Sequence, residues 1–386
     1  MALSITQLPA SCSLAQSPTI FTLSESGLVY TSASFQYYLE LYYWNGTPSN
    51  SGSVENYTLV KYPNASNVGI FDVSRILNST LTDSAAANSS NVKYFKTDGY
   101  FRFQSASVFI TSSHVESGVY KALDGYALFD EPIGQQITSK SIHWPLMTDG
   151  PVSQSVLADD YGTAGVYVGT TGGSVPTKLV YSGSVNNGTF TLSGSVSSSQ
   201  QVQQYPQAPQ ESGFPISTLS DRYSIQAFSG STALGTPINF EVVCKQKYPN
   251  VRIKWKNRYG QFDWFDFYMV NKQSFSTTVR GYQPQLGTWT GATLGYNQYD
   301  SSNLNYIVDS KQAISVNTFW ISENYNDILK QLLVSDEIYW VTNEQTDESK
   351  PLTIATSNVV FKTGVVDKQI QYQFDFNFGQ NYKLIL

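Results

Sequence analysis

The chain has 386 residues, a formal net charge of −6 and a charged fraction of 13%, about half the share that soluble domains usually carry. An acidic chain with so few Lys and Arg lacks the basic surface of a nucleic-acid-binding protein. Its length allows two or three domains with their own cores. The 27 Tyr, 21 Phe and 7 Trp suit both cores and protein contacts.

Residues 1–134 are predicted to form a β-sandwich of immunoglobulin-like size. In 35–44, apolar and polar side chains alternate with the period of a half-buried strand. Phe71 ends a later strand, and Asp72 is placed to cap a short helix over 73–81. Further strands are expected at 93–95, 100–111 and 119–129.

Residues 135–215 read as a Gly/Ser/Thr-rich β insertion followed by a linker. Short strands are expected at 166–168, 178–181 and 189–192, separated by turn residues. The Ser/Gln/Pro tract 197–210 has the composition of a flexible or extended segment. We therefore expect a domain boundary near residue 215.

Residues 251–267 predict a strand hairpin with its turn at 257–260, where Gly260 is free to adopt positive φ. On the first strand Val251, Ile253 and Trp255 alternate with three cations, which we expect to form a solvated face: Arg252, Lys254 and Lys256. On the second strand both faces are aromatic. One face is therefore expected to meet a second sheet, and the other a neighbouring subunit.

The remainder of 216–386 predicts a second β-sandwich with one helix. Ser322 is placed to cap the helix, and Ile328, Leu329 and Leu332 form one apolar stripe along it. The last regular strand has one strongly apolar face and is expected to be docked in a sheet; that face comprises Ile370, Tyr372, Phe374, Phe376 and Phe378. The predicted fold is therefore all-β and multidomain, with two short helices.

The sequence offers few candidates for catalytic or metal-binding residues. His114 lies in an expected turn and His143 at a strand end, and no nucleophile or metal-binding motif accompanies either. Adjacent carboxylates such as Asp336 and Glu337 would diverge on a strand. We expect no enzyme activity, no cofactor and no metal.

Targeting signals and cysteine pairing are not expected either. The N-terminal stretch has no signal-peptide pattern, and no apolar run is long enough to cross a membrane. Cys12 and Cys244 are too few for a disulfide scaffold, which favours assembly in a reducing cytoplasm.

Two non-enzymatic roles stay open: a structural subunit of a large assembly, and a ligand-binding module that stacks aromatic rings on sugars. Candidate stacking residues are Trp44, Tyr282 and Trp289. For such residues, packing in a core or subunit contact is the more common use.

Stretches 63–77 and 253–267, together with the ending around 367–374, resemble tail- or neck-associated virion proteins of tailed bacteriophages, especially short-tailed and crAss-like phages of Bacteroidetes. The resemblance implies a structural subunit that assembles in the host cytoplasm as a homo-oligomeric ring or collar. Its partners would be other virion proteins of the tail, neck or portal-proximal region. The alternatives are a receptor- or glycan-binding tail protein, or a capsid decoration or head-fibre protein.

No active-site residue comes with this resemblance. The side chains expected to build the core or the subunit contacts are Trp255, Asn257, Gly260, Phe262, Trp264, Phe265, Phe267, Phe71, Asp72, Tyr372, Phe374 and Phe376.

Overall fold

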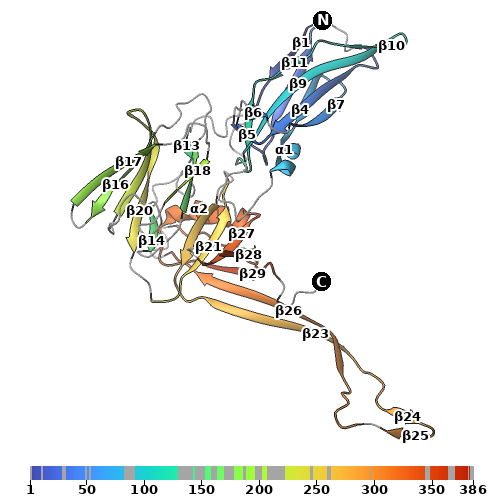
Figure 1. Cartoon of the computed structure of the whole chain (residues 1–386), viewed down its shortest axis with the longest axis vertical. Coiled ribbons are helices and arrows are strands. Elements are labelled where there is room, and N and C mark those ends of the chain that lie inside the picture. Colours follow the sequence, from blue (N-terminus) through green and yellow to red (C-terminus); the bar gives the residue numbers. More distant parts are fainter. Residues whose placement is uncertain are drawn as a thin grey trace.

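The structure is a computed structural model of the whole chain (Figure 1). It describes residues 2–9, 12–27, 32–47, 50–51, 54–81, 92–128, 142–143, 153–157, 163–168, 178–185, 188–195, 202–206, 222–243, 247–258, 262–295, 297–343, 348–363, 370–380 and 382. Strands in several sheets account for most of these residues, with two short α-helices. The predicted all-β, multi-sheet fold with two short helices is confirmed.

The N-terminal part is a two-sheet sandwich. The smaller sheet has the order β1 (Leu3–Gln7), β3 (Ile20–Glu25), β8 (Val68–Asp72). The larger sheet has the order β2 (Cys12–Leu14), β12 (Tyr120–Leu123), β9 (Val92–Ser105), β4 (Gln36–Trp44), β7 (Glu55–Lys61). The short strands β10 (Val108–Thr111) and β11 (Val115–Glu116) also pair with β9, and β5 (Gly46–Thr47) pairs with β6 (Asn50–Ser51).

Among the described strands, this order is that of an immunoglobulin-like sandwich without the edge strand beyond β8 in the smaller sheet. Strands β2 and β12 pair in parallel, and the other strand pairs of the sandwich are antiparallel. The alternation seen in 35–44 places every second side chain of β4 in the core. There the chain buries Phe21, Leu23, Tyr37, Leu39, Leu41, Phe71, Phe95 and Phe101.

Helix α1 (Ser74–Thr80) follows β8 as expected, but it starts one residue later than predicted. The N-cap position belongs to Val73, which makes no side-chain cap bond. Asp72 nevertheless stabilises the start, because its Oδ1 accepts the N–H groups of Ser74 at 3.0 Å and Thr19 at 3.1 Å. The same carboxylate thus fastens the helix to the loop before β3.

The middle of the chain contributes two sheets. One has three strands: β13 (Ile142–His143), β15 (Thr163–Val168) and β18 (Val202–Pro206). The other has five: β14 (Ser153–Leu157), β20 (Thr232–Val243), β19 (Arg222–Ser229), β16 (Lys178–Val185) and β17 (Gly188–Ser195).

Strand pairing in these two sheets crosses residue 215, where a domain boundary was expected. Strands β19 and β20 follow that point, yet they pair with β16 and β14, which precede it. The tract 197–210, expected to be a linker, contains β18, which pairs with β15. Backbone hydrogen bonding between distant strands is not visible in composition, and this explains the difference.

The C-terminal part is one seven-stranded antiparallel sheet, where a second sandwich was expected. Its order is β22 (Phe262–Phe267), β21 (Val251–Lys256), β27 (Ile338–Asn343), β28 (Glu348–Ile354), β29 (Gln373–Phe378), β26 (Leu304–Asn317), β23 (Lys272–Tyr282). A 3₁₀ turn, η2 (Glu323–Tyr325), leads into helix α2 (Asn326–Val334), whose apolar stripe packs on the sheet.

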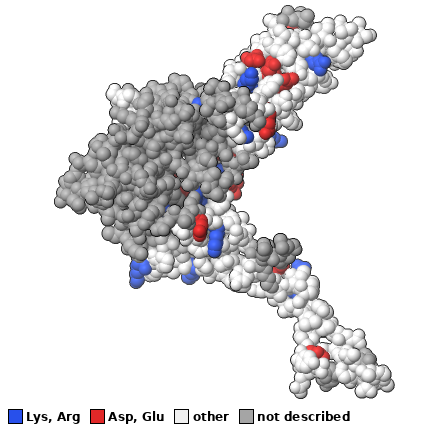
Figure 2. All heavy atoms as spheres, viewed as in Figure 1, with Lys and Arg blue, Asp and Glu red and all other residues white. Residues whose placement is uncertain are grey.

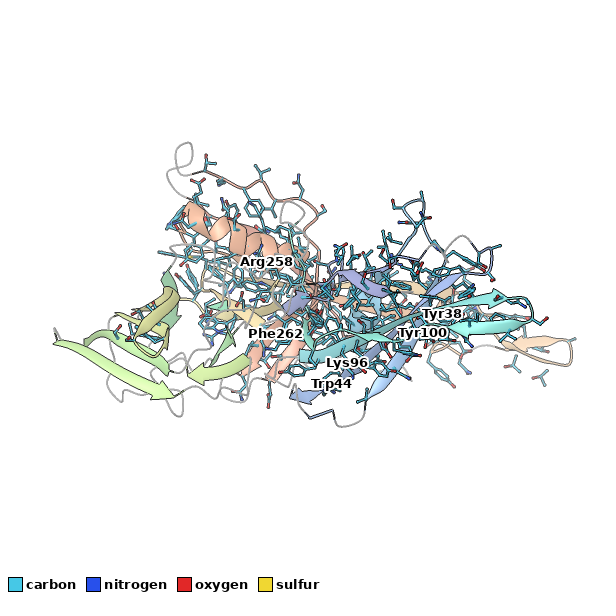
Figure 3. The ribbon with its side chains drawn as sticks, turned by 90° about the horizontal axis from the view of Figure 1, so that it is seen from above. Tyr38, Trp44, Lys96, Tyr100, Arg258 and Phe262 are labelled. Carbon is cyan, nitrogen blue, oxygen red and sulfur yellow. The ribbon has the colours of Figure 1, made fainter. Side chains whose placement is uncertain are left out.

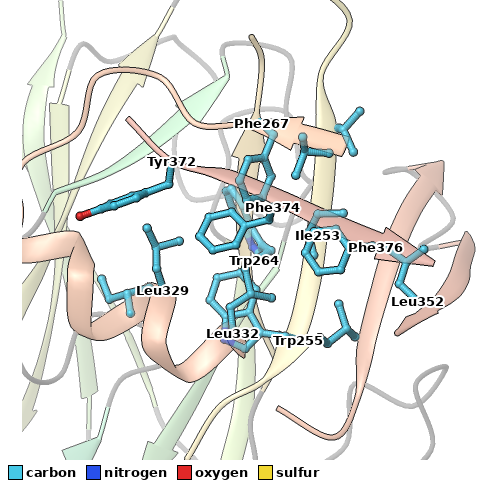
Figure 4. Packing of buried hydrophobic residues seen from close by; sticks show 14 of the residues in the cluster. Ile253, Trp255, Trp264, Phe267, Leu329, Leu332, Leu352, Tyr372, Phe374 and Phe376 are labelled. Atoms are coloured by element: carbon cyan, nitrogen blue, oxygen red, sulfur yellow. The ribbon is translucent and has the colours of Figure 1, made fainter. Parts of the chain in front are cut away.

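The core between α2 and the sheet is dense in aromatics (Figure 4). Leu329 and Leu332 of α2 are fully buried together with Trp255, Phe374 and Phe376. The prediction of a docked final strand is confirmed, because β29 lies between β28 and β26. Ser322 occupies the N-cap position of the 3₁₀ turn that leads into α2, but its side chain makes no cap bond.

Strands β23 and β26 run beyond the body of the sheet as a long two-stranded arm (Figure 1). Pairing of β26 with β29 covers only Ala313–Asn317, so among the described strands 304–312 pair with β23 alone. The tip carries a small hairpin, β24 (Thr288–Thr290) with β25 (Thr293–Gly295). We call residues 272–312 the arm. Its paired part next to the sheet, residues 272–280 of β23 with 307–312 of β26, is called the shaft.

The aromatic core predicts a large cost for a cavity at Phe374. We expect Phe374→Ala to lower the free energy of unfolding by about 3–5 kcal/mol, because a fully buried ring is removed. Phe275→Ala, the same change at a ring that is 53% exposed, should cost only about 0.5 kcal/mol. Urea unfolding of both variants compares the two, and equal losses would contradict this assignment of the core.

Candidate functional site

The residues predicted for the core or for subunit contacts are mostly core. Six of them are at most 6% exposed and form one C-terminal cluster: Trp255, Trp264, Phe267, Tyr372, Phe374 and Phe376. Phe71 is fully buried in the sandwich. Phe262 and Phe265 are half-buried against the rings of Tyr339 and Tyr325.

The polar residues predicted for the core or for subunit contacts lie in different parts of the structure. Asn257 is buried and donates to Asp263 at 3.0 Å, and Asp72 is exposed at the start of α1. Gly260 lies outside the described residues. The structure therefore brings the C-terminal aromatic members together, and leaves Phe71 and Asp72 apart from them in the N-terminal sandwich.

The expected solvated face of β21 is wrong. Arg252, Lys254 and Lys256 are 3%, 6% and 4% exposed, so both faces of this strand are buried within the chain. Buried cations require partners that compensate the lost hydration. The partners come from other strands and from the N-terminal sandwich, and the local alternation of residues does not reveal them.

Arg252 shows how such burial is compensated. Its guanidinium donates from Nε and Nη2 to the two carboxylate oxygens of Asp266, each at 2.9 Å. The same group lies 3.9 Å from the centre of the Trp264 ring. A bidentate pair stacked on an aromatic face is the geometry that favours Arg over Lys.

Lys256 joins the C-terminal sheet to the N-terminal sandwich. Its Nζ donates to Asp124 at 2.9 Å, to Glu337 at 3.1 Å and to Asp336 at 3.2 Å. Asp124 follows β12 of the sandwich and also accepts Gln16 Nε2 at 3.0 Å. One buried cation thus holds carboxylates from both parts of the chain, and we call this group of residues the junction.

Backbone contacts tighten the junction. The Tyr126 N–H donates to the carbonyl of Arg258 at 2.9 Å. A Cβ added at Gly125 would lie 2.3 Å from that carbonyl oxygen, so only glycine allows this approach. Burial is the largest cause that raises the pKa of the Tyr126 phenol. The junction fixes how the sandwich is oriented on the sheet.

A pocket of about 470 Å³ lies beside the junction, with mainly polar walls: Ala15, Gln16, Pro18, Asp72, Ser74, Arg75, Asn78 and Asp336. Within the described residues, no three His, Cys, Asp or Glu side chains are grouped to hold a metal ion. The described helices include none with the length and apolarity of a membrane span.

The outer face of β4 and β9 carries a row of aromatic rings (Figure 3). Tyr38 and Tyr100 stack with ring centres 5.0 Å apart, and His114 stacks on Tyr100 at 4.6 Å. Arg102 lies over Tyr38 at 5.8 Å, and His114 Nδ1 contacts Asp98 at 2.6 Å. The faces of both tyrosine rings are therefore occupied by neighbours in the same chain.

This arrangement bears on the sugar-stacking residues. Trp44, one of the three candidates, is 4% exposed and stacks on Tyr94, so it is packed in the core, the more common use, and offers no exposed platform for a sugar. Tyr282 is 51% exposed on the arm. The side chain of Trp289 lies outside the described residues.

The arm is highly exposed. Every residue of β23 is exposed, and the arm is largely uncharged along its length (Figure 2). Large apolar side chains on it are between 36% and 85% exposed: Phe275, Val279, Tyr282, Leu286, Leu294, Tyr299, Leu304, Tyr306 and Ile307. A two-stranded ribbon is marginal in water without a surface to pack on.

The two faces of the shaft differ in charge. Cross-strand pairing places Phe275 with Gln312 and Val279 with Val308 on one face, which has no charged residue. The charged residues of the shaft lie on the other face: Lys272, Arg280, Asp309 and Lys311. Such alternation is typical of a sheet that has one face covered.

A β-bulge interrupts the arm. Arg280 pairs with Ile307 and Gly281 with Asn305, so Tyr306 is an extra residue on β26. Beyond the bulge Tyr282 pairs with Leu304, and the rings of Tyr282 and Tyr306 lie 6.3 Å apart.

The junction predicts a penalty for removing its cation. We expect Lys256→Met to lower the free energy of unfolding by about 3–5 kcal/mol, because Asp124 would keep its charge in a buried site. Lys330→Met removes a cation whose pair with Asp327 is exposed, and should cost about 0–1 kcal/mol. Thermal and urea unfolding check both variants, and similar losses would argue against a buried ionic junction.

The aromatic face predicts an unusual tyrosine titration. Glu40, which accepts the Tyr42 hydroxyl, is the largest cause that raises the pKa of Tyr42 to about 12. The phenol is held protonated, so this stabilisation is present below pH 10 and is lost as the pH rises through 12. Glu40→Gln should lower the pKa of Tyr42 towards 10, the ordinary value.

Carbon NMR of labelled tyrosine follows this titration, with Tyr42→Phe assigning the signal. Glu116→Gln is the control, because Glu116 contributes least among the causes that act on Tyr42. A Tyr42 signal that titrates near pH 10 in the unchanged chain would rule out the arrangement.

Comparison with known proteins does not assign the chain to a family. No protein-family model matches it, and no curated protein matches it. The functional argument therefore rests on the junction, the aromatic face of the sandwich and the arm.

Proposed function

We propose that the chain is a structural subunit of a bacteriophage virion that assembles as a homo-oligomeric ring or collar in the tail or neck. Its role is geometric and involves no catalysis. The sandwich and the sheet set the spacing within one subunit, and the arm provides contacts between subunits and with other virion proteins.

The exposed arm is the observation that carries this proposal. Phe275 and Val279 are 53% and 50% exposed on the uncharged face of the shaft. Among the described rings, that of Phe275 contacts only Tyr382, edge to face with centres 5.1 Å apart, and half of the side chain stays exposed. Burial of apolar surface is favourable by about 25 cal/mol per Å², so this ribbon is expected to find a partner. Extended apolar surface on a soluble protein is typical of a protein contact.

The remaining features are consistent with an assembly subunit. The junction holds the sandwich against the sheet through buried charges, as a subunit of fixed shape requires. The chain is poor in charge, which lowers the repulsion between copies packed together. The virion setting rests on the sequence resemblance to tail- and neck-associated phage proteins.

The mass of the full chain in solution tests the proposal. We expect light scattering after size exclusion to give a multimer that loses subunits on dilution. Phe275→Thr with Val279→Thr should weaken assembly at least tenfold, since tenfold corresponds to about 1.4 kcal/mol of lost burial. Threonine keeps the strand propensity of these positions.

The matched control combines Val334→Thr and Val360→Thr, which change two side chains that are 66% and 77% exposed away from the arm. It should assemble like the unchanged chain. A chain that stays monomeric at its highest soluble concentration, or arm variants that assemble normally, would contradict the proposed role of the arm.

A further inference from the structure

Two strand edges in the described chain lack the usual protection against pairing. The first is the outer edge of β7, which pairs with β4 over seven residues without a register shift. Its central residues 56–60 carry no charge and no proline, and Tyr57 and Val60 are 52% and 46% exposed. Among the described strands, none pairs with the other side of β7.

The second is the outer edge of β23, the last strand of the C-terminal sheet. Residues 273–279 carry no charge and no proline, and the register with β26 is continuous until the bulge at Arg280. Natural edge strands are usually short, charged, bulged or covered, because a flat free edge pairs with other chains.

We infer that the β23 edge of one copy pairs antiparallel with the β7 edge of a second copy. This inference rests on the proposed role as a homo-oligomeric subunit and names the contact. Within one copy β7 and β23 lie far apart, on the sandwich and on the arm (Figure 1). The pairing therefore joins two molecules by strand addition.

Charge selects the register. Arg280 lies at one end of the flat β23 edge and Glu55 at one end of β7. With Arg280 opposite Glu55, antiparallel pairing places Phe275 opposite Val60. Phe275 and Val60 then meet on one face and the opposite charges Arg280 and Glu55 on the other, as cross-strand pairs favour.

The same register extends the aromatic row of the sandwich. Val60 is the cross-strand partner of Tyr38, and Tyr38 is the partner of Tyr100. Phe275 of the second copy would join this row at its outer end. The uncharged face of the shaft would thus gain an apolar neighbour, Val60 of the first copy.

Charge also favours this pairing over one between two arms. Antiparallel overlap of the uncharged stretches 273–279 of two β23 edges would place Lys272 opposite Arg280, and like charges opposite one another are destabilising. The shaft carries three cations against the single acid Asp309, whereas the whole chain has a formal net charge of −6. The shaft is therefore attracted to the acidic remainder of another copy.

Disulfide trapping between two single-cysteine chains tests the pairing. In full-length chains with Cys12→Ser and Cys244→Ser, one chain carries Val60→Cys and a differently tagged chain carries Phe275→Cys. Mild oxidation of the mixture should give a mixed disulfide dimer, and neither chain alone should cross-link. Thr278→Cys is the control partner, because its side chain lies on the opposite face of β23 from Phe275.

Each other outcome overturns the inference. A disulfide between two Val60→Cys chains would indicate pairing of β7 edges, and one between two Phe275→Cys chains would indicate pairing of arms. A multimer by light scattering without the mixed disulfide would leave the proposed function intact and exclude this contact. A monomer in the same measurement would reject both.

Charge reversal gives an independent readout. Glu55→Arg or Arg280→Glu alone should weaken assembly several-fold, because each places like charges opposite one another. The chain with both changes should assemble nearly as tightly as the unchanged chain. Failure of the double change to restore assembly would reject the proposed register.

Discussion

The orientation of the sandwich depends on Lys256, a buried cation that contacts carboxylates from two parts of the chain. Asp124 reaches it from the end of β12, whereas Asp336 and Glu337 come from the loop between α2 and β27. Because the cation has little access to water, separating the two parts would leave charge without compensation in a poorly hydrated site. The position of β7 relative to the arm is a consequence of this contact.

Sequence alternation was sufficient to predict the strands that bury one face and expose the other. The regular alternation in 35–44 and 370–378 places those strands correctly in their cores, because burial of every second residue is a local property. The solvated face on β21 failed for the opposite reason. Lys256 is compensated by Asp124, which lies 132 residues away in sequence, and no local pattern encodes that partner.

The arm was also hard to predict. Its Ser- and Thr-rich strands have few apolar residues, and their alternation is weak. Exposure of Phe275 and Val279 follows from how far the arm extends beyond the sheet, and this is a property of the tertiary structure. Trp44 illustrates the converse, because an aromatic residue at a strand end is buried there by its neighbours.

The extra residue in the bulge changes which side of the arm is apolar. Before it, Phe275, Val279 and Val308 share one face; after it, Tyr282 and Leu304 lie on the opposite face together with Ile307. The arm therefore has two exposed apolar patches on opposite faces. A ribbon of this kind can lie between two protein surfaces and bind one with each face, which a hairpin with a single apolar face could not do.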